Sequence, residues 1–238
     1  MRRLAAPLMG LALLWPGEVL AYRPFDSTDA AVADRNVWEI ELGPLNWRHN
    51  DDGTQWVVPA AIINYGFADN WEAVLEGRNN ILARGGAKFS DAAASLKTVL
   101  HEGSLQEKEG VSLGSEFSVL LPGIGTEDGA GLEWTLLASD RKDDYAWHFN
   151  IGPMLSRDGH GGMVMGGILE GPKDWPARPV AELRYERAFG GDELFAQLIG
   201  LIFPVEEHLA LDIAYRHARE NGRPDQQIRA GITFDLGK

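Results

Sequence analysis

The sequence predicts an all-β protein: a single antiparallel transmembrane β-barrel of about twelve strands, following an N-terminal signal peptide. Two observations predict it. Apolar and polar residues alternate along about twelve segments, which in strand geometry places each set on its own face. The segments are also longer than the five or six residues typical of globular strands, and they match a tilted membrane-spanning strand of ~9–11 residues with its ends.

Composition narrows the classes of protein. The chain has 238 residues, a formal net charge of −13 and no cysteine. Disulfide scaffolds, cysteine-ligated zinc and thiol catalysis are therefore excluded, and the acidic balance argues against binding to nucleic acid. No run of 18 apolar residues follows the N-terminal region, so a closed barrel is the form in which this sequence would cross a membrane.

The first residues have the pattern of an export signal. Arg2 and Arg3 precede an apolar run over residues 4–15, and Val19 and Ala21 occupy the −3 and −1 positions of a cleavage site. We therefore predict three parts: a signal peptide (1–21), a periplasmic N-terminal segment (22–35) and a transmembrane β-barrel (36–238). A short N-terminal membrane anchor is the alternative to a cleaved signal.

We expect strands near residues 36–47, 55–67, 71–82, 92–103, 110–121, 131–139, 144–155, 162–171, 177–188, 192–203, 208–218 and 227–236. Residues 92–107 also suit a helix, because Ala, Leu and Lys are good helix formers. The segment 192–203 is apolar on both faces, and Pro59 removes a hydrogen-bond donor from 55–67. Loop lengths indicate short turns at one end of the barrel and longer loops, such as 48–54 and 219–226, at the other.

Periodicity alone leaves open which face is inside. A soluble barrel would bury its apolar face, whereas a membrane barrel exposes it to lipid. Aromatic residues near segment ends, such as Trp38 and Trp71, favour the membrane form, as does a polar face of mixed sign. Trp38, Leu75, Leu113, Trp147, Leu183 and Ile213 should then form an outward belt. Charged residues should line the lumen as a solute pathway: Glu72, Glu76, Arg78, Lys97, Glu116, Glu182, Arg184, Glu186, Asp212, Arg216 and Arg229.

Two motifs resemble a known family. The segment Tyr22-Arg23-Pro24-Phe25-Asp26-Ser27-Thr28-Asp29-Ala30 and the turn Asn64-Tyr65-Gly66-Phe67-Ala68-Asp69-Asn70 are similar to motifs of the bacterial outer-membrane family named after the meta-pathway of phenol degradation. The resemblance is loose along the rest of the chain. It implies an exported barrel in the bacterial outer membrane and a channel for small, often hydrophobic or aromatic compounds.

The sequence lacks the common catalytic patterns of outer-membrane enzymes. Barrel lipases place a His and a Ser two residues apart on one strand, and none of the six His residues has a Ser in that position. His148 has Asn150 there instead, and the sequence shows no Gly-x-Ser-x-Gly elbow and no calcium-loop pattern. We therefore expect no enzyme activity, no cofactor and no metal.

The sequence thus predicts an outer-membrane barrel that acts as a passive channel for small solutes. Expected partners are outer-membrane lipid, a small-molecule solute and the outer-membrane assembly machinery, and nucleic acid is not among them. Two alternatives remain. One is a structural or surface-display barrel that transports nothing, and the other is a soluble periplasmic barrel that binds a lipid or aromatic ligand.

Overall fold

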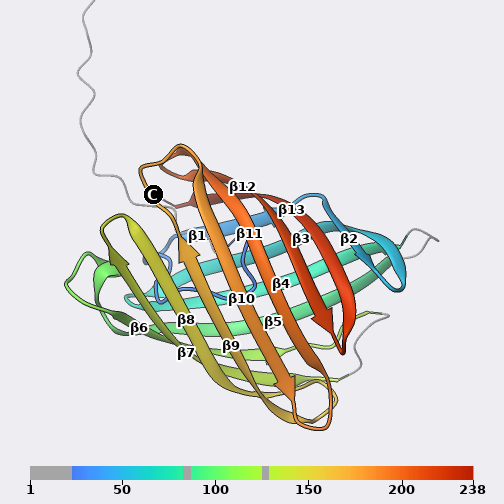
Figure 1. Ribbon diagram of the computed structural model, residues 1–238. Helices are drawn as coiled ribbons and strands as arrows, with labels where there is room; N and C mark the ends of the chain where they lie inside the picture. Colours follow the sequence, from blue (N-terminus) through green and yellow to red (C-terminus); the bar gives the residue numbers. More distant parts are fainter. Residues whose placement is uncertain (1–22, 83–86, 125–128, 238) are drawn as a thin grey trace, which may run out of the picture.

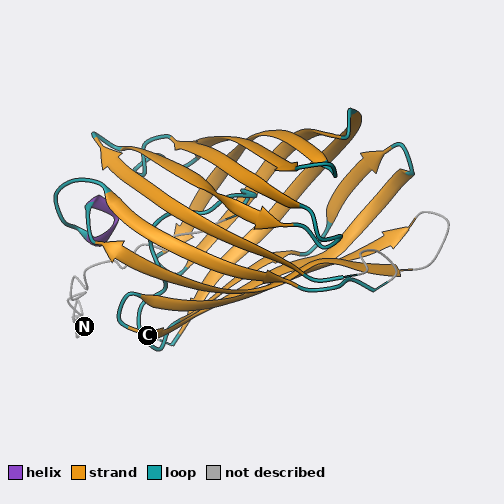
Figure 2. Cartoon of the chain, turned by 90° about the horizontal axis from the view of Figure 1, so that it is seen from below, coloured by secondary structure: helices purple, strands orange, loops and turns teal. Residues whose placement is uncertain are grey.

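The computed structural model describes residues 23–82, 87–124 and 129–237. The predicted signal peptide lies outside this range. The described residues form one antiparallel sheet that closes on itself, with strands tilted around a common axis (Figures 1 and 2). The strands are β1 (Trp38–Gly43), β2 (Asn46–Asn50), β3 (Gly53–Ala68), β4 (Trp71–Leu82), β5 (Ala87–His101), β6 (Ser112–Leu120), β7 (Gly131–Lys142), β8 (Tyr145–Leu155), β9 (Gly161–Glu170), β10 (Arg178–Ala188), β11 (Glu193–Glu206), β12 (Leu209–Glu220) and β13 (Arg223–Leu236).

Twelve positions around the barrel hold these thirteen strands. β1 and β2 both lie between β3 and β13, and both run antiparallel to each, so they are two halves of one strand interrupted at Pro44–Leu45. Trp38 pairs with Leu236 where β1 begins and β13 ends, and we call this end of the barrel the terminal end. Asn50 pairs with Asp225 toward the opposite end, which we call the distal end. The predicted twelve-strand closed barrel is confirmed.

The ambiguous segments are all strands. β5 covers most of 92–107, so the helical alternative is wrong, and only a short 3₁₀ turn, η1 (Ser104–Gln106), follows it. Pro59 lies where the register of β3 against β4 shifts, between Val57 and Ala60, so its missing donor falls at an irregularity of the ladder. Among the described residues, no helix is long and apolar enough to cross a membrane.

The expected contrast in loop length is wrong. The connections predicted as long loops at 48–54 and 219–226 are two-residue turns at 51–52 and 221–222, because the strands on both sides continue further than the alternation indicated. A ten-residue connection at 102–111 lies at the terminal end, where short turns were expected.

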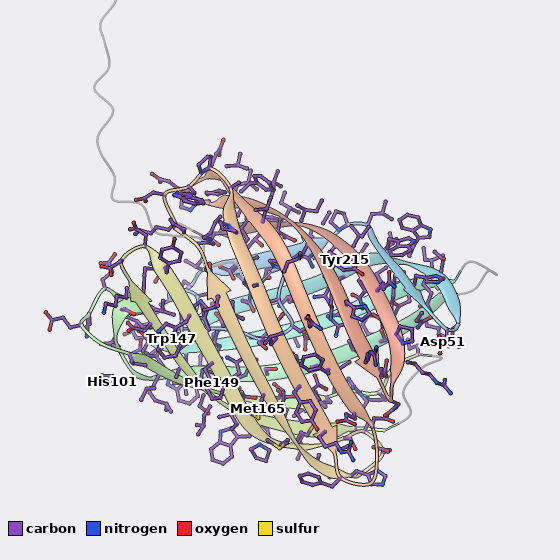
Figure 3. The ribbon with its side chains drawn as sticks, viewed as in Figure 1. Asp51, His101, Trp147, Phe149, Met165 and Tyr215 are labelled. Atoms are coloured by element: carbon purple, nitrogen blue, oxygen red, sulfur yellow. The ribbon has the colours of Figure 1, made fainter. Side chains whose placement is uncertain are left out.

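The faces of the barrel are arranged as in a membrane protein. The six belt residues predicted to point outward are between 37% and 57% exposed. Alternate positions carry buried polar residues, and β8 shows the pattern clearly: Trp147 and Phe149 project outward, while His148 and Asn150 are buried (Figure 3). This arrangement contradicts the soluble-barrel alternative, because a soluble barrel would place its apolar face inside.

Candidate functional site: the barrel interior

The chain ahead of β1 lies inside the barrel. Residues 23–34, here called the inner segment, follow the inside of the wall at the terminal half of the lumen (blue in Figure 1; Figure 2). Along the segment, its hydrogen bonds reach β12, β10, β8, β7 and β4 in that order. The sequence predicted residues 22–35 as a separate periplasmic segment. The structure places residues 23–34 within the lumen, which alternation along strands could not indicate.

Asp26 is the electrostatic centre of the inner segment. Its carboxylate lies 2.5 Å from Nε of Arg216, 2.7 Å from Nη2 of Arg229 and 3.7 Å from Nη2 of Arg78. Arg184 donates a 2.9 Å hydrogen bond to the backbone carbonyl of the same residue. Burial raises the pKa of Asp26, but the surrounding guanidinium groups outweigh it, led by Arg216, and hold the pKa well below its ordinary value.

Wall side chains also satisfy the backbone of the inner segment. Glu182 accepts hydrogen bonds from the amides of Asp26 and Ser27, at 2.8 and 2.7 Å. Asn150 both accepts from the amide of Thr28 and donates to its carbonyl, at 2.9 and 2.7 Å. Buried backbone groups need partners, and here the barrel wall supplies them where secondary structure does not.

One apolar contact anchors the start of the inner segment. Phe25 is 9% exposed and packs in a cluster with Ile168, Val180, Leu198, Ile202, Ala210 and Ala214, which come from β9 to β12. The contact explains why the predicted strand 192–203 is apolar on both faces. Leu198 and Ile202 face inward to Phe25, whereas Ile199 and Leu201 face lipid.

Glycines in the wall give the inner segment its room. A Cβ at Gly166 would lie 2.0 Å from Oγ of Ser27, and one at Gly66 would lie 2.2 Å from the carbonyl oxygen of Asp34. Neither separation is compatible with a side chain. The inner segment can therefore pack directly against the backbone of the wall at these two glycines.

Above the inner segment lies a polar cavity of about 940 Å³. Phe25, Asp26, Ser27 and Thr28 line its inner side, and residues of the distal turns, including Asp52 and Asp192, line its mouth. The inner segment thus occupies part of the terminal half of the lumen, and the cavity extends from it to the distal turns.

The predicted lumen residues divide between the cavity and the inner segment. Eight of them line the cavity: Glu72, Glu76, Arg78, Lys97, Glu116, Arg184, Glu186 and Arg216. Arg229 lines a smaller pocket beside the segment, while Glu182 and Asp212 hydrogen-bond to the segment itself. A role of these residues in solute passage stays a prediction.

Sequence reasoning missed several inward residues. Arg48 and Asp225 form a 2.5 Å ion pair between β2 and β13 at the edge of the cavity. Both fall in segments interpreted as loops, so their place on an inner face was not visible. Glu133, which lies 3.7 Å from Arg184, also lines the cavity and is absent from the predicted lumen set.

The barrel also brings together a Ser, a His and a Glu that the sequence keeps apart. His148 lies 2.9 Å from Oγ of Ser139 through Nδ1 and 2.9 Å from Glu170 through Nε2. Ser139 and His148 are both buried, neither lines the cavity, and Ser139 accepts a hydrogen bond from the amide of Ala30. The group therefore serves to hold the inner segment. Within the described ranges, no group of His, Asp and Glu side chains is placed to hold a metal ion.

Comparison with known proteins establishes the fold. No family model matches the chain, and no curated protein matches it by sequence. Solved structures do match. The COG4313 outer membrane channel from Pseudomonas putida F1 is 9% identical with a TM-score of 0.63, over 89% of this chain and 100% of that one.

Two further structures support the same conclusion. The NanC porin is 10% identical with a TM-score of 0.60, over 84% of this chain and all of the other. The KdgM porin in complex with disordered oligogalacturonate is 13% identical with a TM-score of 0.56, over 82% and 98%. The chain therefore has the fold of outer-membrane channel barrels.

Proposed function

We propose that this protein is a passive channel for small solutes in the bacterial outer membrane, with the inner segment closing or narrowing its lumen. The observation that carries the proposal is the polar cavity of about 940 Å³ inside a barrel whose outer surface is apolar. Small barrels fill their interiors with side chains, and close packing stabilises them. A purely structural barrel would keep this stabilisation, whereas a hollow, charged lumen gives it up.

Passage through the whole barrel requires the inner segment to move. Apart from the Phe25 cluster, polar contacts with the wall hold the segment, and they can be exchanged for contacts with water. In the described part of the chain, the first β-bridge that joins the segment's continuation to the sheet is the one between Arg35 and Gly66. We therefore propose that residues 23–34 leave their wall contacts when the channel conducts.

The resemblance to the phenol meta-pathway family adds a hydrophobic or aromatic solute as one candidate class. The cavity lining favours a polar solute instead, because most of its side chains are charged or carry amide or hydroxyl groups. We also propose that the chain is a member of that family and that the outer-membrane assembly machinery is one of its partners.

Liposome swelling tests the function. Purified protein is reconstituted, and swelling is followed in small uncharged sugars of increasing size, with Asp26→Ala beside the wild type. We expect slow entry of the smallest sugars in the wild type and faster entry in the variant. If both proteins are folded, inserted and impermeable to every solute, the barrel is a structural or surface-display protein and the channel proposal is wrong.

A further inference from the structure

The described residues that line the cavity are unequal in charge. Thirteen are Asp or Glu, and seven are Arg or Lys. Walls of low dielectric focus the field of such an excess into the lumen, where it concentrates ions of the opposite sign. The cavity is therefore electronegative.

Most of those cations are already neutralised. Arg48, Arg78, Lys97, Arg184 and Arg216 each lie within 4 Å of a carboxylate. Three of these five pair with the inner segment, on Asp26 or Asp29. The other two cations, Lys88 and Arg157, lie near the distal ends of β5 and β8. Little positive charge remains in the cavity to meet an anionic solute.

Among the described residues, two carboxylates inside the barrel line the cavity without forming an ion pair. In the described part of the chain, neither Glu76 on β4 nor Glu116 on β6 has a basic nitrogen within 4 Å, although both line the cavity. Glu116 lies within electrostatic range of Glu72, Glu76 and Glu133. Lys97 on β5 lies between Glu72 and Glu116, but its ammonium pairs with Asp29, and Arg184 pairs with Glu133. Within the described ranges, Glu76 and Glu116 therefore remain on this wall without an ion pair of their own.

Glu72 gives this wall a specific feature. The side chain is 0% exposed and also lines the cavity. Its Oε2 accepts a 2.5 Å hydrogen bond from the amide of Ala33, whereas its Oε1 has no hydrogen-bond partner among the described residues. A buried carboxylate oxygen without a partner is costly, and a cationic donor would relieve that cost.

We propose that the solute of this cavity is a small organic cation, an aliphatic amine whose ammonium groups bind Glu72, Glu76 and Glu116. The inference rests on the proposed channel function and names its solute class. Glu72 and Glu76 are four residues apart on one strand face, roughly 13 Å at ~3.3 Å per residue. Glu116 lies opposite Lys97, which in turn lies opposite Glu72, so it is two strands away.

This spacing selects among cations. No described group of acidic side chains is close enough to hold a single metal ion. Carboxylates spread along and across the wall instead suit an elongated molecule whose positive charges are separated by methylene groups. A linear polyamine has this form, and its ammonium groups donate charge-assisted hydrogen bonds to carboxylates.

Isothermal titration calorimetry of the detergent-solubilised full chain tests the proposal, with spermidine as the cation and propane-1,2,3-tricarboxylate as an anion of matching charge number. We expect saturable binding of spermidine and none of the tricarboxylate. Glu76→Gln/Glu116→Gln should weaken spermidine binding by at least about tenfold. The control Glu107→Gln/Glu109→Gln makes the same change in net charge on the exposed 102–111 connection, and it should bind as the wild type does.

Equal weakening in both double variants would mean nonspecific attraction to an acidic protein and would overturn the proposal, as would binding of the tricarboxylate. The uncharged-sugar swelling assay runs in parallel with the same proteins. Swelling without spermidine binding refutes the solute class alone. Spermidine binding without any swelling refutes the channel function.

Discussion

Asp26 and Arg216 are 190 positions apart in the sequence, and a 2.5 Å hydrogen bond joins Oδ2 of the first to Nε of the second. Both side chains are at most 10% exposed. The contact connects the inner segment to β12, and Arg229 on β13 reinforces it from the next strand. Asp26 therefore links the inner segment to the wall of the barrel.

Replacing Asp26 by Ala should release the inner segment. Arg216 and Arg229 would lose a buried partner, and removal of one member of a buried ion pair costs about 3–5 kcal/mol. We expect a higher mean conductance in planar bilayers. Asp69→Ala is the control, because its 3.9 Å pair with Arg35 is exposed and worth at most about 1 kcal/mol. Equal conductance in the two variants would contradict the role of Asp26.

Two adjacent glycines allow a steric test. Gly166→Val would drive a side chain into Ser27, whereas Gly167→Val would meet nothing within 4 Å. We expect faster liposome swelling for the Gly166 variant and wild-type swelling for the Gly167 variant. Identical swelling of the two variants would show that the segment does not press against β9 in the membrane.

The charge of Asp26 predicts a pH dependence. A carboxyl whose pKa is lowered on folding stabilises the folded arrangement fully above its ordinary pKa of 3.8, and this contribution is lost as the pH falls through the lower, folded value. Hydrogen exchange measures protection of residues 23–34, in the wild type and in Asp26→Asn. The amides of residues 23–34 should be more protected in the wild type than in the variant. This difference in protection should be constant between pH 5 and 7 and shrink below about pH 3.8. A difference that shrinks between pH 5 and 7 would contradict the assignment.

The outer face predicts a stability effect. Leu183 is 56% exposed on β10, and an Arg on the lipid face costs about 2–4 kcal/mol near the bilayer midplane. Unfolding by denaturant in lipid vesicles should show that loss for Leu183→Arg. Glu109→Arg, on an exposed connection, should change stability by less than about 0.5 kcal/mol. A loss of similar size in both variants would argue against a lipid-facing wall.

The barrel could be predicted from the sequence because alternation acts at every strand. Leu211, Ile213 and Tyr215 face outward, whereas Asp212 and Arg216, at the alternate positions, are buried. A period of two in the sequence reflects both facts. The turns were less predictable. Polar, Gly-rich sequence occurs both in long loops and at the ends of long strands, so it does not distinguish them. Arg223, for example, begins β13 although it lies in a segment predicted as a loop.

The inner segment could not be predicted in the same way. Its contacts are with residues more than 100 positions away, such as Glu182 and Asn150, and the segment itself has no periodicity. One signal was present. The doubly apolar strand around Leu198 and Ile202 had no explanation in a simple barrel, and Phe25 supplies it. Gly166 gave no signal, because it is one of two adjacent glycines and only the fold distinguishes them.

An engineered disulfide can show whether residues 23–34 lie inside the barrel in the native membrane. The chain has no cysteine, and a Cβ at Gly114 would lie 3.5 Å from Cβ of Ala30, within the range of disulfides. In oxidised outer membranes, Ala30→Cys/Gly114→Cys should form one intramolecular disulfide nearly completely, whereas Ala30→Cys/Gly167→Cys, with its second thiol on the outer face, should not. Free, alkylatable thiols in the first variant would contradict the account.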